Sequence, residues 1–276
     1  MIWDERFIAA EDGAKLFCRA AGTGTPLLMI HGAACDSDFF LALGERMSGR
    51  YRVILYDRRG YGRSEGGGAA KAPDSGAHFA RQASDAARVL RQSGAESAVV
   101  LGCSYGALVA LYLADAYPEL VSRALLHEPP AYSQMPDDAD GRERIDGILH
   151  CIEQQKYMRA LNRFLLFLTS ASAPGDRPMT EAEEESFTRN GLYFIEHEFA
   201  FGFDTELLIP LLSEQTNPVF LRGENSREMP LWKCARRLAE RQNCAVYDFP
   251  GGHNGARDQP DEFGAALDGL LKTPAV

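Results

Sequence analysis

Short, mostly apolar runs recur along this chain, and they limit the folds that it can adopt. Four of these runs lie at residues 26–30, 51–56, 98–101 and 121–126. Each is too short for an ordinary helix and fits a strand that is buried on both faces. Residues 78–92 carry apolar side chains at spacings of three and four, which is typical of an amphipathic helix. With a further helix expected at residues 107–116, this alternation predicts an α/β fold with a mostly parallel central sheet flanked by helices.

The same pattern continues at both ends of the chain. A hairpin is expected where two short strands flank a turn, at residues 6–9 and 15–20. Near the other end, strands are expected at residues 219–221 and 245–249. They alternate with helices that are expected at residues 231–242 and 261–271.

One long segment interrupts the alternation. Residues 129–209 contain helical stretches and no clear strand. The helices within this segment are expected at residues 140–155, 157–168 and 181–201. We therefore expect a core domain made of residues 1–128 and 210–276, with a helical cap, or lid, at residues 129–209.

Composition and charge exclude several classes of function. The net charge of −10 offers no positive surface for nucleic acid or for an anionic membrane. No apolar run reaches the roughly 20 residues of a membrane span, and the N-terminus carries no secretory signal, so a cytoplasmic protein is expected. The six cysteines form no CxxC pair, and the six histidines form no HxH or HExxH pattern. We expect reduced thiols and neither a metal nor a cofactor.

The sharpest local motif is a GxSxG element. The string Gly102-Cys103-Ser104-Tyr105-Gly106 lies between an expected strand and an expected helix. A nucleophile elbow requires this context, because the sharp turn lifts a serine hydroxyl clear of the sheet and needs small residues beside it. We therefore expect Ser104 to be a nucleophile, with the Cys103 side chain packed toward the core.

A histidine near the C-terminus can supply the base that a serine nucleophile needs. The string Pro250-Gly251-Gly252-His253-Asn254 follows the last expected strand, where the chain returns to the carboxyl edge of the sheet. Its two glycines allow a tight turn that presents the imidazole ring. We expect His253 to be the base, on the role that the second member of a catalytic triad must play.

Four elements in sequence order resemble the α/β-hydrolase family. They are His31-Gly32-Ala33, Asp57-Arg58-Arg59-Gly60-Tyr61-Gly62-Arg63-Ser64, the GxSxG element and the histidine loop. The first resembles the family's oxyanion loop, and the second resembles its D-x-R-G-x-G-x-S loop. The resemblance implies an oxyanion hole made by the backbone N–H of Tyr105 and one from Gly32 or Ala33. Such donors stabilise the charge that develops on a carbonyl oxygen.

The acid of the expected triad departs from the family's commonest pattern. Most members carry an aspartate three residues after the glycine that follows the seventh strand, and Ser226 occupies that position here. Glu224 lies two residues before it and is the alternative acid. Glu128 follows the fourth apolar run, a position that supplies the acid in some members, and we expect it to orient His253. The neighbouring His127 is expected to be packed and hydrogen-bonded.

A GCSxG element with a glutamate 24 residues after its serine resembles lactone hydrolases of the zearalenone-degrading type and related bacterial esterases. The expected cap is rich in aromatic side chains; some would pack on the core, and the rest would line an apolar cleft. They are Phe164, Phe167, Phe187, Tyr193, Phe194, Phe199, Phe201 and Phe203. We predict a serine hydrolase that cleaves a carboxylic ester or lactone of a largely apolar small molecule through an acyl-enzyme.

Two other functions remain open from the sequence. The fold could be retained as a ligand-binding protein with slow or no turnover, since position 226 lacks an aspartate. The same fold could also carry non-hydrolytic chemistry such as C–C cleavage or cyclisation. The sequence specifies neither the substrate nor the oligomeric state.

Overall fold

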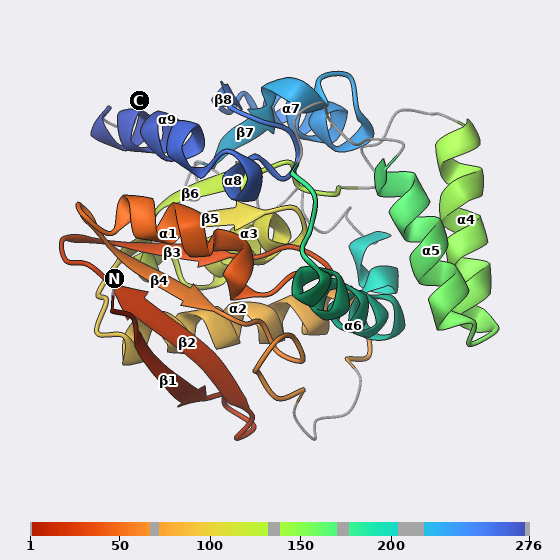
Figure 1. The fold of residues 1–276 in the computed structure, drawn as a ribbon, viewed down its shortest axis with the longest axis horizontal. Coiled ribbons are helices and arrows are strands. Elements are labelled where there is room, and N and C mark those ends of the chain that lie inside the picture. Colours follow the sequence, from red (N-terminus) through yellow and green to blue (C-terminus); the bar gives the residue numbers. More distant parts are fainter. Residues whose placement is uncertain (1, 67–71, 132–138, 170–176, 204–217, 274–276) are drawn as a thin grey trace.

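The computed structural model describes residues 2–66, 72–131, 139–169, 177–203 and 218–273. Within these residues, an eight-stranded sheet has the order β1-β2-β4-β3-β5-β6-β7-β8 (Figure 1). The strands are β1 Asp4–Ala9, β2 Lys15–Ala21, β3 Thr25–Ile30, β4 Tyr51–Tyr56, β5 Ala98–Cys103, β6 Val121–His127, β7 Val219–Gly223 and β8 Val246–Phe249. Strands β3 to β8 run parallel, and β2 is antiparallel to both β1 and β4. The predicted fold class is therefore confirmed.

Some element ends differ from the sequence expectation for local reasons. The helix expected at residues 78–92 begins three residues earlier, as α2 Ser75–Gln92. The Asp74 side chain accepts a hydrogen bond from the Ala77 N–H at 2.8 Å and so caps the helix. The helix expected at residues 107–116 begins within the GxSxG motif, as α3 Tyr105–Ala116. The apolar pattern did not predict η1 Ser37–Phe40 and α1 Leu41–Met47, which follow β3.

Side chains of the central strands alternate between two hydrophobic cores, one on each face of the sheet. In β3, Leu28 belongs to one core, while its neighbours Leu27 and Met29 belong to the other. Helices α2, α3 and α7 cover the first face, and α1, α8 and α9 cover the second (Figure 1). The bounds of the last three helices of the chain are α7 Pro230–Gln242, α8 Gly255–Asp258 and α9 Pro260–Lys272. Because both faces are covered, the strands consist of continuous apolar runs.

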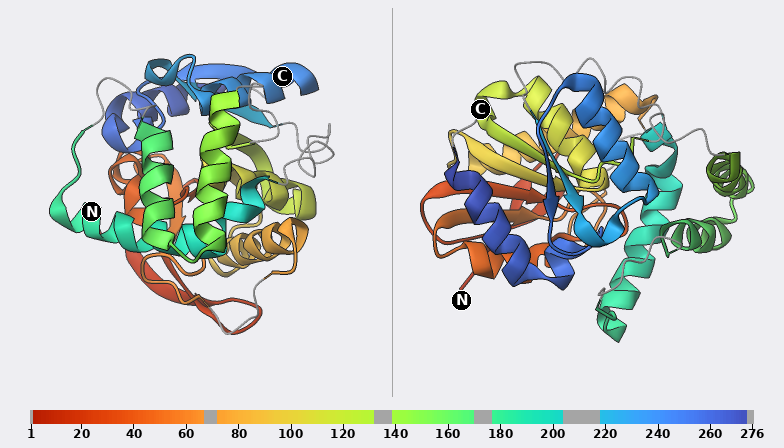
Figure 2. Two further views of the ribbon diagram at one scale, coloured as in Figure 1. Left: turned by 90° about the vertical axis from the view of Figure 1, so that its right-hand side faces the viewer. Right: turned by 90° about the horizontal axis from the view of Figure 1, so that it is seen from above.

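The helices between β6 and β7 lie to one side of the sheet (Figure 2). Within the described residues they are α4 Ala139–Glu153, α5 Tyr157–Thr169, α6 Glu181–His197 and η4 Phe199–Phe203. The single helix expected at residues 181–201 is thus two elements. Phe194 and Phe199 join the same core as α2 and α3, so the segment packs on the sheet domain. Its assignment as a separate cap stays a prediction, and residues 132–138, 170–176 and 204–209 of it lie outside the described ranges.

A capping box begins α6. The Thr180 side chain accepts a hydrogen bond from the Glu183 backbone N–H, and the Glu183 carboxylate accepts one from the Thr180 backbone N–H. These two bonds satisfy donors that a helix N-terminus otherwise leaves unpaired. In the part of the chain that the structure describes, no helix is both long and apolar enough to cross a membrane.

Phe263 in α9 provides a test of the second core. Its side chain is fully buried, and its ring centroid lies 4.9 Å from that of Phe249. Phe263→Ala is expected to lower the free energy of unfolding by about 3–5 kcal/mol, because truncation leaves a cavity. Leu166→Ala, which removes an exposed side chain of α5, should change it by less than about 0.5 kcal/mol. Urea unfolding followed by circular dichroism measures both, and equal losses would contradict this packing.

Candidate active site

Ser104 occupies a sharp turn between β5 and α3. Its backbone has φ 53° and ψ −125°, a conformation that residues other than glycine rarely adopt. Strain of this kind costs about 1–3 kcal/mol and persists where the surrounding structure enforces it. The Ser104 N–H donates to the His127 carbonyl at 2.8 Å, and the Ser104 carbonyl accepts from the Ala107 N–H at 2.8 Å. The turn therefore has the strand-to-helix geometry of a nucleophile elbow.

The glycines around Ser104 are required by close backbone contacts. A Cβ on Gly106 would lie 2.2 Å from the carbonyl oxygen of Ile30, and one on Gly102 would lie 2.3 Å from that of Gly106. A Cβ on Gly32 would lie 2.9 Å from Ser104 Cβ and 3.5 Å from its Oγ. The elbow and the loop after β3 therefore pack together with no room for side chains.

A buried carboxylate contacts the imidazole of His253. Glu128 Oε2 lies 2.7 Å from His253 Nδ1, and the two side chains are 1% and 22% exposed. Glu128 directly follows β6, whereas His253 lies in the loop between β8 and α8. Both line the same cavity as Ser104. With Nδ1–H facing the carboxylate, Nε2 is left to accept a proton.

The other oxygen of Glu128 is held by the loop after β7. The Gly223 N–H donates to Oε1 at 2.9 Å, and the Ser226 hydroxyl donates to the same oxygen. Ser226, at the position of the commonest acid, thus hydrogen-bonds a carboxylate that comes from another strand. Glu224 is exposed at the start of η6 Glu224–Ser226, and the carboxylate that contacts His253 is that of Glu128.

Hydrogen bonds keep the buried Glu128 side chain ionised. Burial opposes its ionisation, but the hydrogen bonds from His253 and from the Ser226 hydroxyl outweigh burial and hold its pKa below the ordinary value. Its backbone is also unusual, with φ 46°, and its N–H donates to the Leu221 carbonyl at 3.0 Å. A carboxylate fixed in this way can stabilise an imidazolium ion.

His127 is packed as expected, but its expected hydrogen bonds are absent among the described residues. The side chain is fully buried, and its ring centroid lies 5.5 Å from that of Phe263. Neither ring nitrogen has a hydrogen-bond partner in that part of the chain. Burial lowers the pKa of His127 to about 4, so the ring is neutral at physiological pH.

The segments expected to supply oxyanion donors lie beside Ser104. Tyr105 begins α3, so its backbone N–H lies in the first turn, at the positive end of the helix dipole. Gly32 and Ala33 follow β3 and line the cavity together with Ser104. The structure thus brings together the segments that the sequence resemblance assigned to the oxyanion hole.

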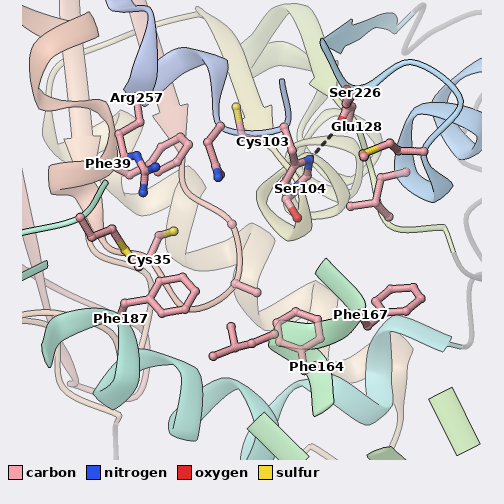
Figure 3. Close-up of a pocket in the computed structure, with 18 of the residues that line it drawn as sticks. Cys35, Phe39, Cys103, Ser104, Glu128, Phe164, Phe167, Phe187, Ser226 and Arg257 are labelled. Carbon is pink, nitrogen blue, oxygen red and sulfur yellow. Dashed lines mark hydrogen bonds and ion pairs between the residues drawn. The ribbon is translucent and has the colours of Figure 1, made fainter. Parts of the chain in front are cut away.

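A cavity of about 510 Å³ opens beside Ser104 (Figure 3). Three aromatic side chains, Phe164 and Phe167 of α5 and Phe187 of α6, face Ser104 and Glu128 across it. Other apolar lining residues include Phe39, Leu165, Pro178, Met179, Met229, Pro230 and Leu231. The cavity wall is therefore mostly apolar, which is typical of small-molecule sites.

The other aromatic side chains of the helical segment serve in packing. Phe194, Phe199 and Phe201 are buried, and the rings of Phe194 and Phe199 lie 5.8 Å apart. Tyr193 packs edge-on against Tyr61 at 5.1 Å. The side chain of Phe203 lies outside the described part of the chain. The expected division between packing and lining residues holds for those that are described.

Several polar lining residues were not placed in the cavity by the sequence, and Cys103, Arg177 and Arg257 are among them. Cys103 belongs to the second core, as expected, but it also lines the cavity. Arg177 and Arg257 line it as well, and each contacts a carboxylate: Arg177 Nη1 lies 3.0 Å from Glu183, and Arg257 Nε lies 2.6 Å from Asp258. Arg177 precedes α6 and Arg257 lies in the short helix α8, and a single cation carries no spacing signal, so their placement could not be predicted.

Comparisons with known proteins agree with this architecture. A family model described as alpha/beta hydrolase fold matches residues 25–145. An uncharacterized hydrolase, YraK of Bacillus subtilis, is 27% identical over 266 residues, which cover 94% of this chain and 93% of that protein.

Solved structures share the fold at low sequence identity. An esterase from Exiguobacterium antarcticum has a TM-score of 0.73 at 21% identity, covering 98% of this chain and 100% of its own. Est816, described as an N-acyl homoserine lactone degrading enzyme, has a TM-score of 0.70 at 18% identity, with coverages of 96% and 100%. A bromoperoxidase from Bacillus anthracis has a TM-score of 0.75 at 19% identity, with coverages of 98% and 100%.

The parallel sheet covered on both faces and the serine at a strand-to-helix elbow define a protein of the α/β-hydrolase class. A family model of this fold matches residues 25–145, and the solved structures share the fold over nearly the whole chain, so the chain has the α/β-hydrolase fold. The family resemblance carried by the four sequence elements is thus confirmed.

The lowered pKa of Glu128 predicts a pH-dependent contribution to stability. Because the pKa of Glu128 is lower in the folded state, the ionised side chain stabilises the fold at pH values above the ordinary pKa of 4.5. This contribution is lost as the pH falls through the lower pKa of the folded state. The difference in unfolding free energy between wild type and Glu128→Gln should therefore shrink as pH falls below 4.5. Urea unfolding at a series of pH values measures it. A difference that stays constant over this range would contradict the proposed ionisation.

Proposed function

We propose that this protein is a serine hydrolase that cleaves a carboxylic ester or lactone of a largely apolar substrate through an acyl-enzyme. The observation that carries the proposal is the buried Glu128 carboxylate, 2.7 Å from His253 Nδ1, in the cavity that Ser104 lines. A serine, an imidazole and a carboxylate in this relation are the components of a catalytic triad.

The proposed reaction proceeds in two halves. Ser104 Oγ attacks the carbonyl carbon while His253 Nε2 takes its proton, and the oxyanion is stabilised by the backbone N–H of Tyr105 and of Gly32 or Ala33. His253 returns the proton to the leaving alcohol, and Glu128 stabilises the transient imidazolium. Water then repeats the sequence on the acyl-enzyme and releases the acid.

The cavity wall supports an apolar substrate. Phe164, Phe167 and Phe187 form the wall opposite Ser104, so in this proposal residues 129–209 act as a cap that selects the substrate. Two structural neighbours are described as an esterase and as a lactone-degrading enzyme, which is consistent with cleavage of an ester or lactone. The sequence-based alternative of a binding protein rested on the missing aspartate at position 226. The contact of Glu128 with His253 supports an enzyme instead.

Covalent labelling tests the nucleophile. A p-nitrophenyl alkylphosphonate is expected to form an adduct on Ser104, because a hydroxyl paired with a base attacks phosphorus as it attacks a carbonyl. Mass spectrometry of digested protein locates the adduct, and Ser104→Ala is the control. Folded wild-type protein that remains unlabelled at Ser104 would count against the proposal.

Substitution of the two candidate acids tests the triad. Glu128→Gln is expected to lower kcat for p-nitrophenyl butyrate by about 10⁴-fold, because a neutral amide favours the wrong imidazole tautomer. Glu224→Gln, which changes an exposed carboxylate of the neighbouring loop, should leave kcat within about twofold of wild type.

A double variant provides a rescue for the same test. Ser226 hydrogen-bonds Glu128, so Ser226→Asp in the Glu128→Gln background places a carboxylate near His253 and should restore part of the activity. The reverse pattern, with activity lost in Glu224→Gln alone, would show that Glu128 is not the acid.

A further inference from the structure

A fully buried ion pair joins the loop after β4 to the end of α6. Arg58 and Glu198 have side chains that are 0% and 2% exposed. Arg58 Nη1 lies 2.9 Å from Glu198 Oε1, and Nη2 lies 3.0 Å from Oε2, so the contact is bidentate. Burial of two charges is costly, and such a pair is a weak argument for stability. The pair also makes contacts beyond the link between these two segments.

The same guanidinium also binds the loop that follows β3. Arg58 Nε donates to the His31 carbonyl at 3.2 Å, and Nη2 donates to the Gly32 carbonyl at 3.3 Å. The Arg58 backbone N–H donates to His31 Nε2 at 2.9 Å, so the ring proton resides on Nδ1. That nitrogen lies 2.9 Å from the Gly32 carbonyl and donates to it. The Gly32 carbonyl thus accepts from both Arg58 and His31.

These hydrogen bonds fix the direction of two backbone N–H groups. In a planar trans peptide, the carbonyl of one residue and the N–H of the next point in opposite directions. Donors on the His31 and Gly32 carbonyls therefore set the orientation of the Gly32 and Ala33 N–H groups. Gly32 and Ala33 line the cavity, and a Cβ on Gly32 would lie 3.5 Å from Ser104 Oγ. Arg58 thus acts on peptide groups that lie beside the proposed nucleophile.

Glu198 is in turn held so that it can position Arg58. The Tyr61 hydroxyl donates to Oε2 at 2.6 Å, and Gln82 Nε2 donates to Oε1 at 2.8 Å. The Arg58 guanidinium also lies over the Tyr61 ring at 4.3 Å. The backbone carbonyl of Glu198 accepts from the Tyr105 hydroxyl at 3.3 Å. Glu198 is therefore connected to both segments that supply proposed oxyanion donors.

We propose that Arg58 and Glu198 are positioning residues that orient the Gly32 and Ala33 N–H groups as oxyanion donors. The inference rests on the proposed serine hydrolase function and adds a role for the helical segment between β6 and β7. Through Glu198, the end of α6 sets the geometry of a loop that stabilises the transition state. Neither side chain lines the cavity, so neither contacts the substrate directly.

The test removes both charges together and, with them, the Arg58 hydrogen bonds to the His31 and Gly32 carbonyls. In Arg58→Met/Glu198→Gln, no unpaired buried charge remains, and the side-chain amide oxygen introduced at position 198 can still accept from Tyr61 or Gln82. We expect kcat for p-nitrophenyl butyrate to fall by about 10–100-fold with KM within about threefold of wild type, because the donors act on the transition state. The rate constant for phosphonylation of Ser104 should fall by a similar factor.

A neighbouring ion pair supplies the matched control. Arg59 Nη2 lies 2.8 Å from Asp85 Oδ1, and these side chains are 5% and 2% exposed, but neither touches the loop after β3 in the contacts described. Arg59→Met/Asp85→Asn removes a similarly buried pair whose arginine lies in the same loop and whose aspartate lies in α2. Arg59 Nη1 also lies 2.6 Å from Asp12, a partly exposed carboxylate that solvent can hydrate when Arg59 is replaced. It should keep kcat and the phosphonylation rate constant within about twofold of wild type.

The outcomes separate the inference from the proposed function. If the folded Arg58→Met/Glu198→Gln variant keeps wild-type kcat and phosphonylation, the pair has no positioning role and the inference is wrong. The same conclusion follows if the Arg59 control loses kcat equally. Wild-type protein that neither turns over esters nor reacts with the phosphonate overturns the proposed function, and the inference with it. If the double variant does not fold, Arg58→Lys replaces it: an ammonium keeps the charge but cannot span both carbonyls, so the same loss of kcat is expected.

Discussion

The parallel alignment of β3, β5 and β6 is the constraint on which the proposed site depends. Ile30 pairs with Gly102, and Cys103 pairs with His127, so the three strands end at the same edge of the sheet. Each strand is followed at once by a segment of the site: the loop with Gly32 after β3, Ser104 after β5 and Glu128 after β6. Ligands of open α/β sheets bind outside the carboxyl ends of the strands for this reason. No flexible arm is needed to bring the proposed nucleophile and acid together.

The proposed acid illustrates how a buried charge is accommodated. An unpaired carboxylate in this position would be strongly unfavourable, but both oxygens of Glu128 accept hydrogen bonds. His253 contacts one oxygen, while the Gly223 N–H and the Ser226 hydroxyl donate to the other. Ser226 therefore has a function in this chain that the commonest family pattern does not show. Its hydroxyl donates a hydrogen bond to the Glu128 carboxylate, so a serine at position 226 does not mean that the site lacks an acid.

The sequence predicts the parts of this architecture that depend on local patterns. Apolar runs and helical spacing predict the strands and most helices, and the glycines around Ser104 predict the elbow because only small residues fit there. The position of Glu128 follows from its place directly after a strand. The ion pair between Arg58 and Glu198 could not be predicted, because its members are 140 residues apart and no spacing rule connects them. The sequence also did not predict that the His127 ring is neutral and has no hydrogen-bond partner within the described residues, because its burial depends on tertiary packing.

The supply of the proposed acid from β6 has a consequence for the loop that follows β7. In the commonest pattern this loop must hold a carboxylate at a fixed distance from the histidine, which limits how its backbone can change. Here it needs only a backbone N–H from Gly223 and the hydroxyl of Ser226. The residues that come next, Met229, Pro230 and Leu231, line the cavity. In the proposed mechanism the acid follows β6 while part of the cavity wall follows β7, so the residues after Ser226 could change with the substrate without displacing the acid.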